Sequence, residues 1–260
     1  MKARVLRILQ RFGLLGPAYA AYERLRALRG GVGRAEDGLP VPPPRLRVRV
    51  AGTADLDWFL ESGRLAEESI RSTLARHDTR IEDLSAVLDF GCGCGRVVRR
   101  WRDLAGIHGS DTNDDAIAWC RRNLSFARFE TNALEPPLAF GDESFDLVYA
   151  LSVFTHLTVE LQRDWLGELA RVLRPGGLLL LTTHGVAYEE RLSPDEHGRF
   201  ARGEVVVRWA EVEGTNLCAA YHPPGALAAL LPPGLTFLES EPEGALGNPR
   251  QDVNLVRRTR

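Results

Sequence analysis

Short apolar runs alternate with longer amphipathic stretches through the middle of the chain. The runs predict five buried strands, at residues 87–90, 105–110, 127–131, 143–150 and 178–184. Helical stretches separate them, the first from about residue 96 to residue 104. This alternation predicts an α/β fold, with a parallel sheet and helices on both of its faces. Two later runs, at 235–240 and 252–257, predict an antiparallel pair at the sheet edge, so that seven strands are expected in all.

The segments that flank this core are predicted to cover it. Residues 30–44 are rich in Gly and Pro, which predicts a linker or an extended strap. The alternation at 45–50 predicts a short strand, followed by helices through 58–60 and 66–76. The expected organisation is a basic N-terminal segment and Pro-rich linker (1–44), followed by one domain (45–260). Within that domain we expect a core (84–184), an insertion after the fifth strand (185–232) and the edge strands (233–260). The insertion itself should contain a strand at 204–209 and a short helix at 224–231.

Composition is that of a folded chain with a full core, at 260 residues and 44% hydrophobic content. No uncharged apolar run reaches the length of about 18 residues that would predict a transmembrane helix. Arg4, Arg7 and Arg11 interrupt the first apolar stretch, so no secretory signal is expected. We expect the four cysteines to be free thiols without zinc, and the protein to be cytoplasmic.

Charge is unevenly distributed along the chain. Residues 1–30 carry seven basic residues and one acid, a net charge of +6, although the whole chain has a net charge of −2. Such a segment is either a solvated helix or tail, or an amphipathic segment that touches an acidic membrane surface or a protein partner. The second alternative rests on the helical spacing of Val5, Ile8, Leu9, Phe12 and Leu15. The remaining residues are acidic, which argues against a nucleic acid as partner.

The most informative local feature is the turn that follows the first strand. Asp89 and Phe90 close that strand, and the next residues read Gly91-Cys92-Gly93-Cys94-Gly95. Glycine has no Cβ and tolerates positive φ, so such a turn lets the backbone approach a ligand closely. A dinucleotide fingerprint would require its third glycine at position 96, which is Arg96. The spacing therefore argues against a dehydrogenase.

This turn and four later stretches resemble the motifs of the class I S-adenosylmethionine-dependent methyltransferases. The later stretches, which together with the turn span about 100 residues, are Asp111, Asn132-Ala133, the strand at 143–150 and Arg174-Pro175-Gly176-Gly177. The resemblance implies a Rossmann-like fold of seven mostly parallel strands with an N-terminal helical cover. It also implies S-adenosylmethionine as cofactor, S-adenosylhomocysteine as product, and a substrate lid built by the insertion.

The residues that the resemblance assigns to the cofactor are Asp89, Gly91, Cys92, Gly93, Gly95, Arg96, Asp111, Thr112, Asn132, Ala133, Leu151 and Ser152. Asp111 would accept hydrogen bonds from both ribose hydroxyls. Asn132 stands where the family usually has Asp, and its side-chain oxygen can still accept from the adenine amino group. Some family members use magnesium. The acidic run 111–115 lacks the spacing of a cation loop and suits the start of a helix, so no metal is predicted.

His156, which follows the fourth strand at the edge where ligands bind, is the leading candidate for a general base. The alternative is that it only orders the start of a helix. His222 and Asp252 are further catalytic candidates, unless they belong to a capping loop with Asp252 paired to an arginine. His184 could face the same pocket. Arg64 could meet the cofactor carboxylate, although a solvated arginine is the simpler interpretation. His108 and His197 are expected at the surface.

Together these observations predict an enzyme that methylates a hydroxyl of a small molecule, such as a sugar, a glycoside or a secondary metabolite. One alternative is methylation of a small amine, which needs no strong base. The other is a non-catalytic assembly protein that binds S-adenosylmethionine.

Overall fold

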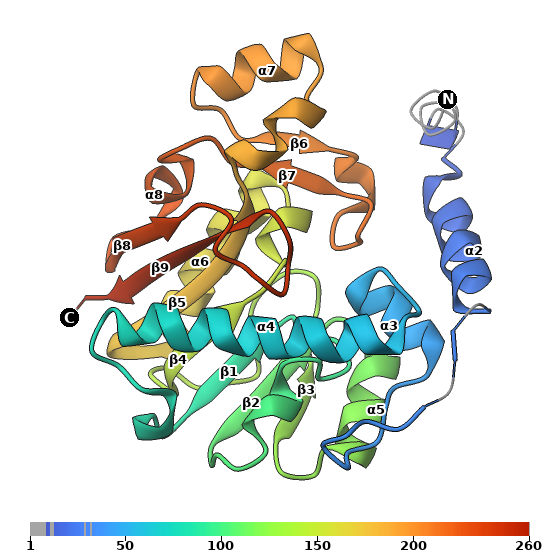
Figure 1. Ribbon diagram of the computed structural model, residues 1–260. Coiled ribbons are helices and arrows are strands. Elements are labelled where there is room, and N and C mark those ends of the chain that lie inside the picture. Colours follow the sequence, from blue (N-terminus) through green and yellow to red (C-terminus); the bar gives the residue numbers. More distant parts are fainter. Residues whose placement is uncertain (1–8, 11–12, 29, 32, 260) are drawn as a thin grey trace.

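The computed structural model describes residues 9–10, 13–28, 30–31 and 33–259, and its strands form one mixed sheet (Figure 1). Five strands pair in parallel in the order β3-β2-β1-β4-β5, and the antiparallel strands β9 and β8 follow β5. This seven-stranded path confirms the predicted Rossmann-like architecture. The described strands are β1 (Val87–Phe90), β2 (Ile107–Asp111), β3 (Arg128–Thr131), β4 (Phe145–Ala150), β5 (Leu173–His184), β6 (Val206–Arg208), β7 (Ala219–Tyr221), β8 (Leu235–Glu241) and β9 (Gln251–Arg258).

The expected total of seven strands was too low, because the insertion adds the antiparallel pair β6 and β7. This pair joins the carboxyl end of β5 through one parallel partner pair, His184 and Tyr221. The described helices are α2 (Leu15–Ala27), α3 (Pro44–Ala51), α4 (Leu56–Ala75), α5 (Asp114–Asn123), α6 (Val159–Val172), α7 (Pro194–Ala201) and α8 (Ala226–Leu230). Short 3₁₀ turns are η1 (Ile81–Asp83), η2 (Val98–Trp101), η3 (Phe154–His156), η4 (Val186–Arg191) and η5 (Ala210–Val212).

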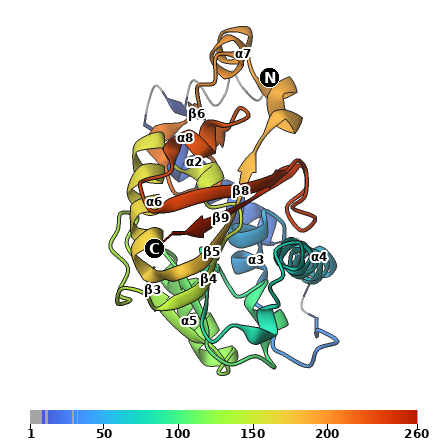
Figure 2. The same ribbon diagram turned by 90° about the vertical axis from the view of Figure 1, so that its left-hand side faces the viewer.

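Helices cover both faces of the sheet, because successive strand residues point to opposite sides. Val87 packs in the cluster that includes Phe59 and Ile70 of α4, whereas Leu88 packs in the cluster that includes Trp165 and Leu169 of α6. Figure 2 shows this layering, with α4 end-on at one side of the sheet and α6 at the other.

The predicted strand at 45–50 was wrong, since these residues form α3. Pro44 stands at the start of that helix, where its fixed φ fits and its missing N–H is not needed, and Gly52 ends it with φ 65°. Arg47 breaks the expected apolar–polar alternation because it is fully buried. Its guanidinium donates hydrogen bonds to the carbonyl oxygens of Ala54, Pro42 and Gly31 at 2.6–3.0 Å.

Two helix predictions also needed correction. Residues 56–75 form the single helix α4, which Asp55 caps by accepting from the N–H groups of Asp57 and Trp58. The predicted helix at 96–104 is limited to the 3₁₀ turn η2. This stretch begins with two adjacent β-branched residues, Val97 and Val98, which weaken helix propensity.

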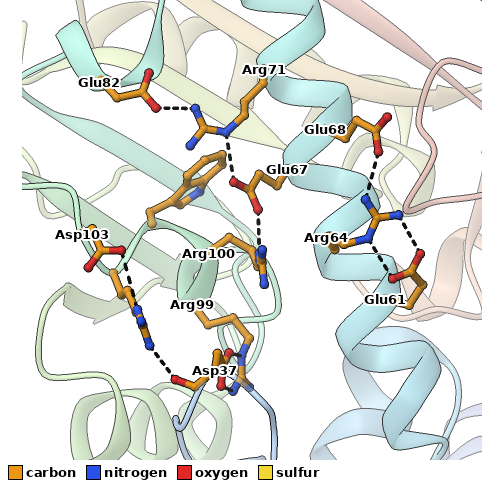
Figure 3. A network of polar contacts seen from close by, with 12 residues as sticks. Asp37, Glu61, Arg64, Glu67, Glu68, Arg71, Glu82, Arg99, Arg100 and Asp103 are labelled. Carbon is orange, nitrogen blue, oxygen red and sulfur yellow. Dashed lines mark hydrogen bonds and ion pairs between the residues drawn. The ribbon is translucent and has the colours of Figure 1, made fainter.

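Ion pairs fasten the N-terminal cover to the segment that follows the glycine turn (Figure 3). Buried Arg99 pairs with Asp37 of the strap at 2.7 Å, and Arg100 pairs with Glu67 of α4 at 2.6 Å. Arg64 pairs with Glu61 and Glu68 on the outer face of α4, and its side chain is 47% exposed. This exposure agrees with the simpler interpretation that Arg64 is a solvated arginine.

Part of the predicted amphipathic N-terminal segment cannot be compared, because Val5, Ile8 and Phe12 lie outside the described residues. Leu15 is buried at the start of α2. No helix in the described part of the chain is both long enough and apolar enough to cross a membrane.

Candidate active site

An open cavity lies at the carboxyl ends of β1, β2 and β4, with an empty volume of about 1090 Å³ including its mouth. The sheet order reverses between β1 and β4. The cavity therefore occupies the topological switch point, where open α/β sheets bind their ligands. Of the predicted cofactor residues, the lining includes Asp89, Gly91, Cys92, Gly93, Arg96, Asp111, Thr112, Asn132, Leu151 and Ser152.

Close packing explains the glycines of the turn. Gly91 and Gly93 have φ of 81° and 53°. A Cβ on Gly91 would lie 2.3 Å from Cγ2 of Val153, and one on Gly93 would lie 2.4 Å from Cγ2 of Val50. Gly95 is not among the residues that line the cavity. It packs instead against Leu124 at the end of α5, where a Cβ would lie 2.4 Å from Cδ1.

The backbone holds the carboxylate of Asp111 in place at the end of β2. Its Oδ2 accepts from the N–H of Gly93 and its Oδ1 from the N–H of Asn113, both at 2.8 Å. Burial is the largest influence and raises the pKa of Asp111, whereas these hydrogen bonds act in the opposite direction. Each carboxylate oxygen retains further acceptor capacity, so the group can still receive a pair of hydroxyls.

Asn132 offers an acceptor that has no partner. Its Nδ2 donates to the carbonyl oxygen of Ala133 at 2.7 Å, whereas Oδ1 is buried without a hydrogen bond. An unpaired buried acceptor is costly, so a ligand with a donor such as an amino group would relieve it. Ala133 supplies this carbonyl group and is not among the residues that line the cavity.

Asp89 is a buried carboxyl group in the cavity wall. The hydroxyl of Tyr149 hydrogen-bonds to it, and Nε1 of Trp101 donates to that hydroxyl at 3.0 Å. Burial raises the pKa of Asp89 to about 7, although Tyr149 and Arg96 act in the opposite direction. This carboxyl group therefore titrates near neutral pH.

Arg96 joins two distant segments above the turn. Its guanidinium donates to the carbonyl oxygens of Ser62 at 2.8 Å and Gly247 at 3.2 Å, and to Oδ1 of Asn248 at 2.9 Å. The backbone of α4 also packs closely against Arg96, since a Cβ on Gly63 would lie 2.5 Å from the carbonyl oxygen of Arg96. An arginine at position 96 thus closes the cavity between α4 and the loop that precedes β9.

The backbone is strained two residues after the end of β4. Ser152 has φ 60°, in the left-handed region that side chains rarely adopt. Its N–H donates to Oγ1 of Thr182 at 2.7 Å, and Nε2 of Gln251 donates to its Oγ at 2.9 Å. These bonds from β5 and β9 hold the strained conformation, as is typical of functional sites.

His156 lies in η3 and lines the cavity beyond Ser152. Its Nδ1 lies 2.7 Å from the carbonyl oxygen of Cys218, so Nδ1 carries the proton and donates it. This leaves Nε2 with a free lone pair. Burial lowers the pKa of His156, although the Cys218 carbonyl acts in the opposite direction. The ring is therefore a neutral base at pH 7.

His222 and Asp252 are not among the residues that line the cavity. His222 belongs to the insertion and is buried, and its Nε2 forms a hydrogen bond with Oε1 of Gln162 at 2.9 Å. The carboxylate of Asp252 accepts from the N–H of Glu243 at 3.0 Å, in place of the expected arginine. His184 stacks on Tyr188 with a centroid distance of 4.2 Å and also lies outside the cavity.

The two histidines that were predicted at the surface differ in their exposure to solvent. His197 is exposed and pairs with Glu189 at 2.8 Å. His108 is only half-buried rather than free at the surface, because its ring packs against Phe140 and Phe145.

Several lining residues were not predicted. They are Arg49, Val50, Phe90, Val97, Asn113, Leu134, Val153, Leu157, Trp165, Gly214, Thr215, Asn216 and Asn248. Asn216 and Asn248 could have been found, because both are polar residues in loops of the covering segments. Nδ2 of Asn216 donates to the carbonyl oxygen of Arg49 at 2.7 Å, which brings the insertion against α3.

The acidic run 111–115 has a structural explanation. Oδ1 of Asn113 caps α5 by accepting from the N–H of Ala116, and Asp114 and Asp115 occupy the first turn of that helix. Across residues 9–10, 13–28, 30–31 and 33–259, no three His, Cys, Asp or Glu side chains gather as metal ligands.

The switch-point cavity, the glycine turn and the acid at the end of β2 define a Rossmann-like nucleotide-cofactor domain. Residues 87–177 match a family model described as a methyltransferase domain. A crystal structure of a methyltransferase dependent on S-adenosylmethionine, from Methanosarcina mazei, shares the fold with a TM-score of 0.54. It is 23% identical, and the match covers 71% of this chain and 97% of that one. Residues 87–177 thus carry a methyltransferase domain, and the fold around them is that of a methyltransferase dependent on S-adenosylmethionine.

Curated relatives match over shorter shares of their length. The chain is 29% identical to the sterol 24-C-methyltransferase of Schizosaccharomyces pombe, over 67% of this chain and 47% of that protein. It is 34% identical to the fatty-acid O-methyltransferase of Mycolicibacterium smegmatis, over 50% of this chain and 47% of that protein. The chain thus spans about half the length of the curated relatives it matches.

Proposed function

We propose that the protein transfers the methyl group of S-adenosylmethionine to a hydroxyl oxygen of a small molecule such as a sugar, a glycoside or a secondary metabolite. The observation that carries this proposal is His156, a buried neutral base whose Nε2 is free in the cavity wall. Asp111 would hold the ribose of the cofactor and Asn132 its adenine amino group. When bound, the cofactor supplies an activated methyl group.

His156 has a defined role under this proposal. Its Nε2 accepts the proton of the acceptor hydroxyl, while the Cys218 carbonyl keeps the proton on Nδ1 and stabilises the imidazolium that forms. Leu151 and Ser152 would contact the methionine part of the cofactor. The covering loop with Asn216 helps to exclude water.

The relatives support oxygen as an acceptor only in part, because one is an O-methyltransferase and another a C-methyltransferase. A neutral histidine base is what a hydroxyl acceptor requires, and an amine acceptor does not need it. The unpaired Oδ1 of Asn132 supports binding of the cofactor, and the neutral His156 in the lining of the same cavity favours an enzyme over the non-catalytic alternative. A small molecule is favoured over a nucleic acid, because residues 31–260 have a net charge of −8.

Calorimetric titration with S-adenosylhomocysteine tests cofactor binding. We expect micromolar affinity, and a loss of about 100-fold or more in Asp111→Ala because two hydroxyl contacts to a charged acceptor disappear. Asp103→Ala is the matched control, since its side chain is 89% exposed. Equal affinity in the wild type and Asp111→Ala would refute the assigned ribose site.

Steady-state kinetics of His156→Gln test the base. With a hydroxyl acceptor, kcat should fall by about 10²–10⁴-fold, while affinity for S-adenosylhomocysteine stays unchanged. Because burial lowers the pKa of His156, wild-type kcat should rise through a pKa below 6.5 and stay level above it. The variant should lack this rise. His197→Gln is the control. An equal loss with an amine acceptor would count against a hydroxyl-specific base.

A further inference from the structure

The outer side of α2 and the residues at its two ends carry large apolar side chains that are exposed. Leu14, Leu25 and Leu28 are 49%, 64% and 82% exposed, and Tyr22 is 49% exposed. Leu14, Leu25 and Leu28 fall on one side of a helix with 3.6 residues per turn, and Ala21 lies between them. Figure 1 shows α2 along the outer edge of the molecule, apart from the sheet.

The opposite side of α2 is already engaged, so the apolar face cannot turn inward. Leu15 is only 3% exposed. Glu23 pairs with Arg49 of α3 at 3.1 Å, and the hydroxyl of Tyr19 hydrogen-bonds to Asn216 of the insertion. Both partners line the active-site cavity. The orientation of α2 is thus fixed by its inner face.

Charge indicates what the outer face meets. Arg24 lies beside the leucine stripe and Arg26 also lies in the last turn of α2, and residues 1–30 carry a net charge of +6. We propose that α2 lies in the plane of an anionic lipid bilayer, with Leu14, Leu25 and Leu28 in the acyl boundary and its arginines at the headgroups. Exposed apolar side chains on one side of a helix with basic residues close by are found in such interfacial helices, and anionic headgroups attract the positive segment.

Two other occupants fit less well. A second copy would bring two segments of charge +6 together, which repel one another. A protein partner would need an acidic apolar groove, and it becomes one outcome of the test. The proposal does not depend on the proposed methyl transfer, since no activity enters its test.

Co-sedimentation of the full chain with vesicles tests the proposal. We expect binding to vesicles of phosphatidylcholine with 30% phosphatidylglycerol, and at least about tenfold weaker binding to pure phosphatidylcholine. Leu25→Ser/Leu28→Ser should weaken the first by about tenfold or more, because two leucines no longer insert. Sodium chloride at 0.5 M should weaken it too. The control Val186→Ser/Leu246→Ser removes exposed apolar side chains elsewhere, at 51% and 44% exposure.

Three results would overturn the proposal. The first is equal vesicle binding by the wild type and Leu25→Ser/Leu28→Ser, with the fold of both checked by circular dichroism. The second is no preference for anionic vesicles. The third is a protein that ignores vesicles but forms a dimer or a complex with another protein through α2, as sedimentation of the leucine variant would reveal.

Discussion

At the scale of single residues, the pKa of Asp89 depends on the side chains that surround it. A line of contacts leads to it from the surface: Arg71 lies over the ring of Trp101 at 5.1 Å, Trp101 donates to Tyr149, and Tyr149 bonds Asp89. The carboxyl group at the end of this line faces the cofactor cavity. Burial raises the pKa of Asp89, and the hydroxyl of Tyr149, together with Arg96, acts in the opposite direction.

Tyr149→Phe should destabilise the protein by about 1–3 kcal/mol, because two buried polar groups each lose a partner. The same change should raise the pKa of Asp89, since the hydroxyl of Tyr149 holds it down. Urea unfolding measures the first effect, and titration of S-adenosylhomocysteine between pH 6 and 8 measures the second. Tyr22→Phe, at an exposed site, is the control. Unfolding midpoints that coincide for all three proteins would contradict the buried network.

At the scale of elements, the glycine turn and α3 depend on each other. Val50 packs on Gly93 so closely that the turn admits no side chain there. α3 in turn is held by the buried guanidinium of Arg47. The turn is therefore shaped by the element that covers it as much as by its own glycines.

Gly93→Ala should weaken binding of S-adenosylhomocysteine by at least about tenfold, because left-handed strain of about 1–2 kcal/mol adds to the clash with Val50. Calorimetry measures the affinity. Gly203→Ala separates the two causes, since Gly203 also has positive φ, at 86°, but a Cβ there would meet nothing within 4 Å. If both variants bound equally well, the close approach of α3 would have no role.

The difference between α3 and β1 shows what sequence patterns can predict. β1 and the glycine turn were predictable because local backbone chemistry dictates them, and the same holds for Asp111 at the end of β2. α3 was not predictable, because Arg47 is satisfied by carbonyl groups of residues 31, 42 and 54, which only the folded chain brings together. His222 misled for the same reason, since its partner Gln162 lies 60 positions away.

At the scale of the whole molecule, three segments converge on the cavity: α3 with α4, the insertion, and the loop before β9. The insertion is docked by buried histidines rather than by an apolar layer alone. His222 contacts Gln162 of α6, and His184 at the end of β5 stacks on Tyr188 and Tyr221. Burial lowers the pKa of His222 to about 4 and that of His184 to about 3.

This docking should fail in acid. A histidine whose folded pKa is depressed gives stability above its unfolded pKa of about 6.5 and loses it as pH falls towards the folded value. Between pH 7 and 4.5, the wild type should lose up to about 3 kcal/mol more than His222→Gln. Urea unfolding at both pH values measures this. Parallel losses in the two proteins would contradict a neutral buried His222.

The clamp made by Arg96 has a consequence for how the protein is made. The glycine turn leaves the ribosome early, but the carbonyl of Gly247 that its arginine needs lies 151 positions later. A nascent chain therefore displays the cradle before it can close it, because closure must wait for β8 and β9 to pair. Cofactor that binds only the closed form stabilises the finished chain alone. Binding of the cofactor would thus favour those chains in which the segment that contains Gly247 has already folded against Arg96.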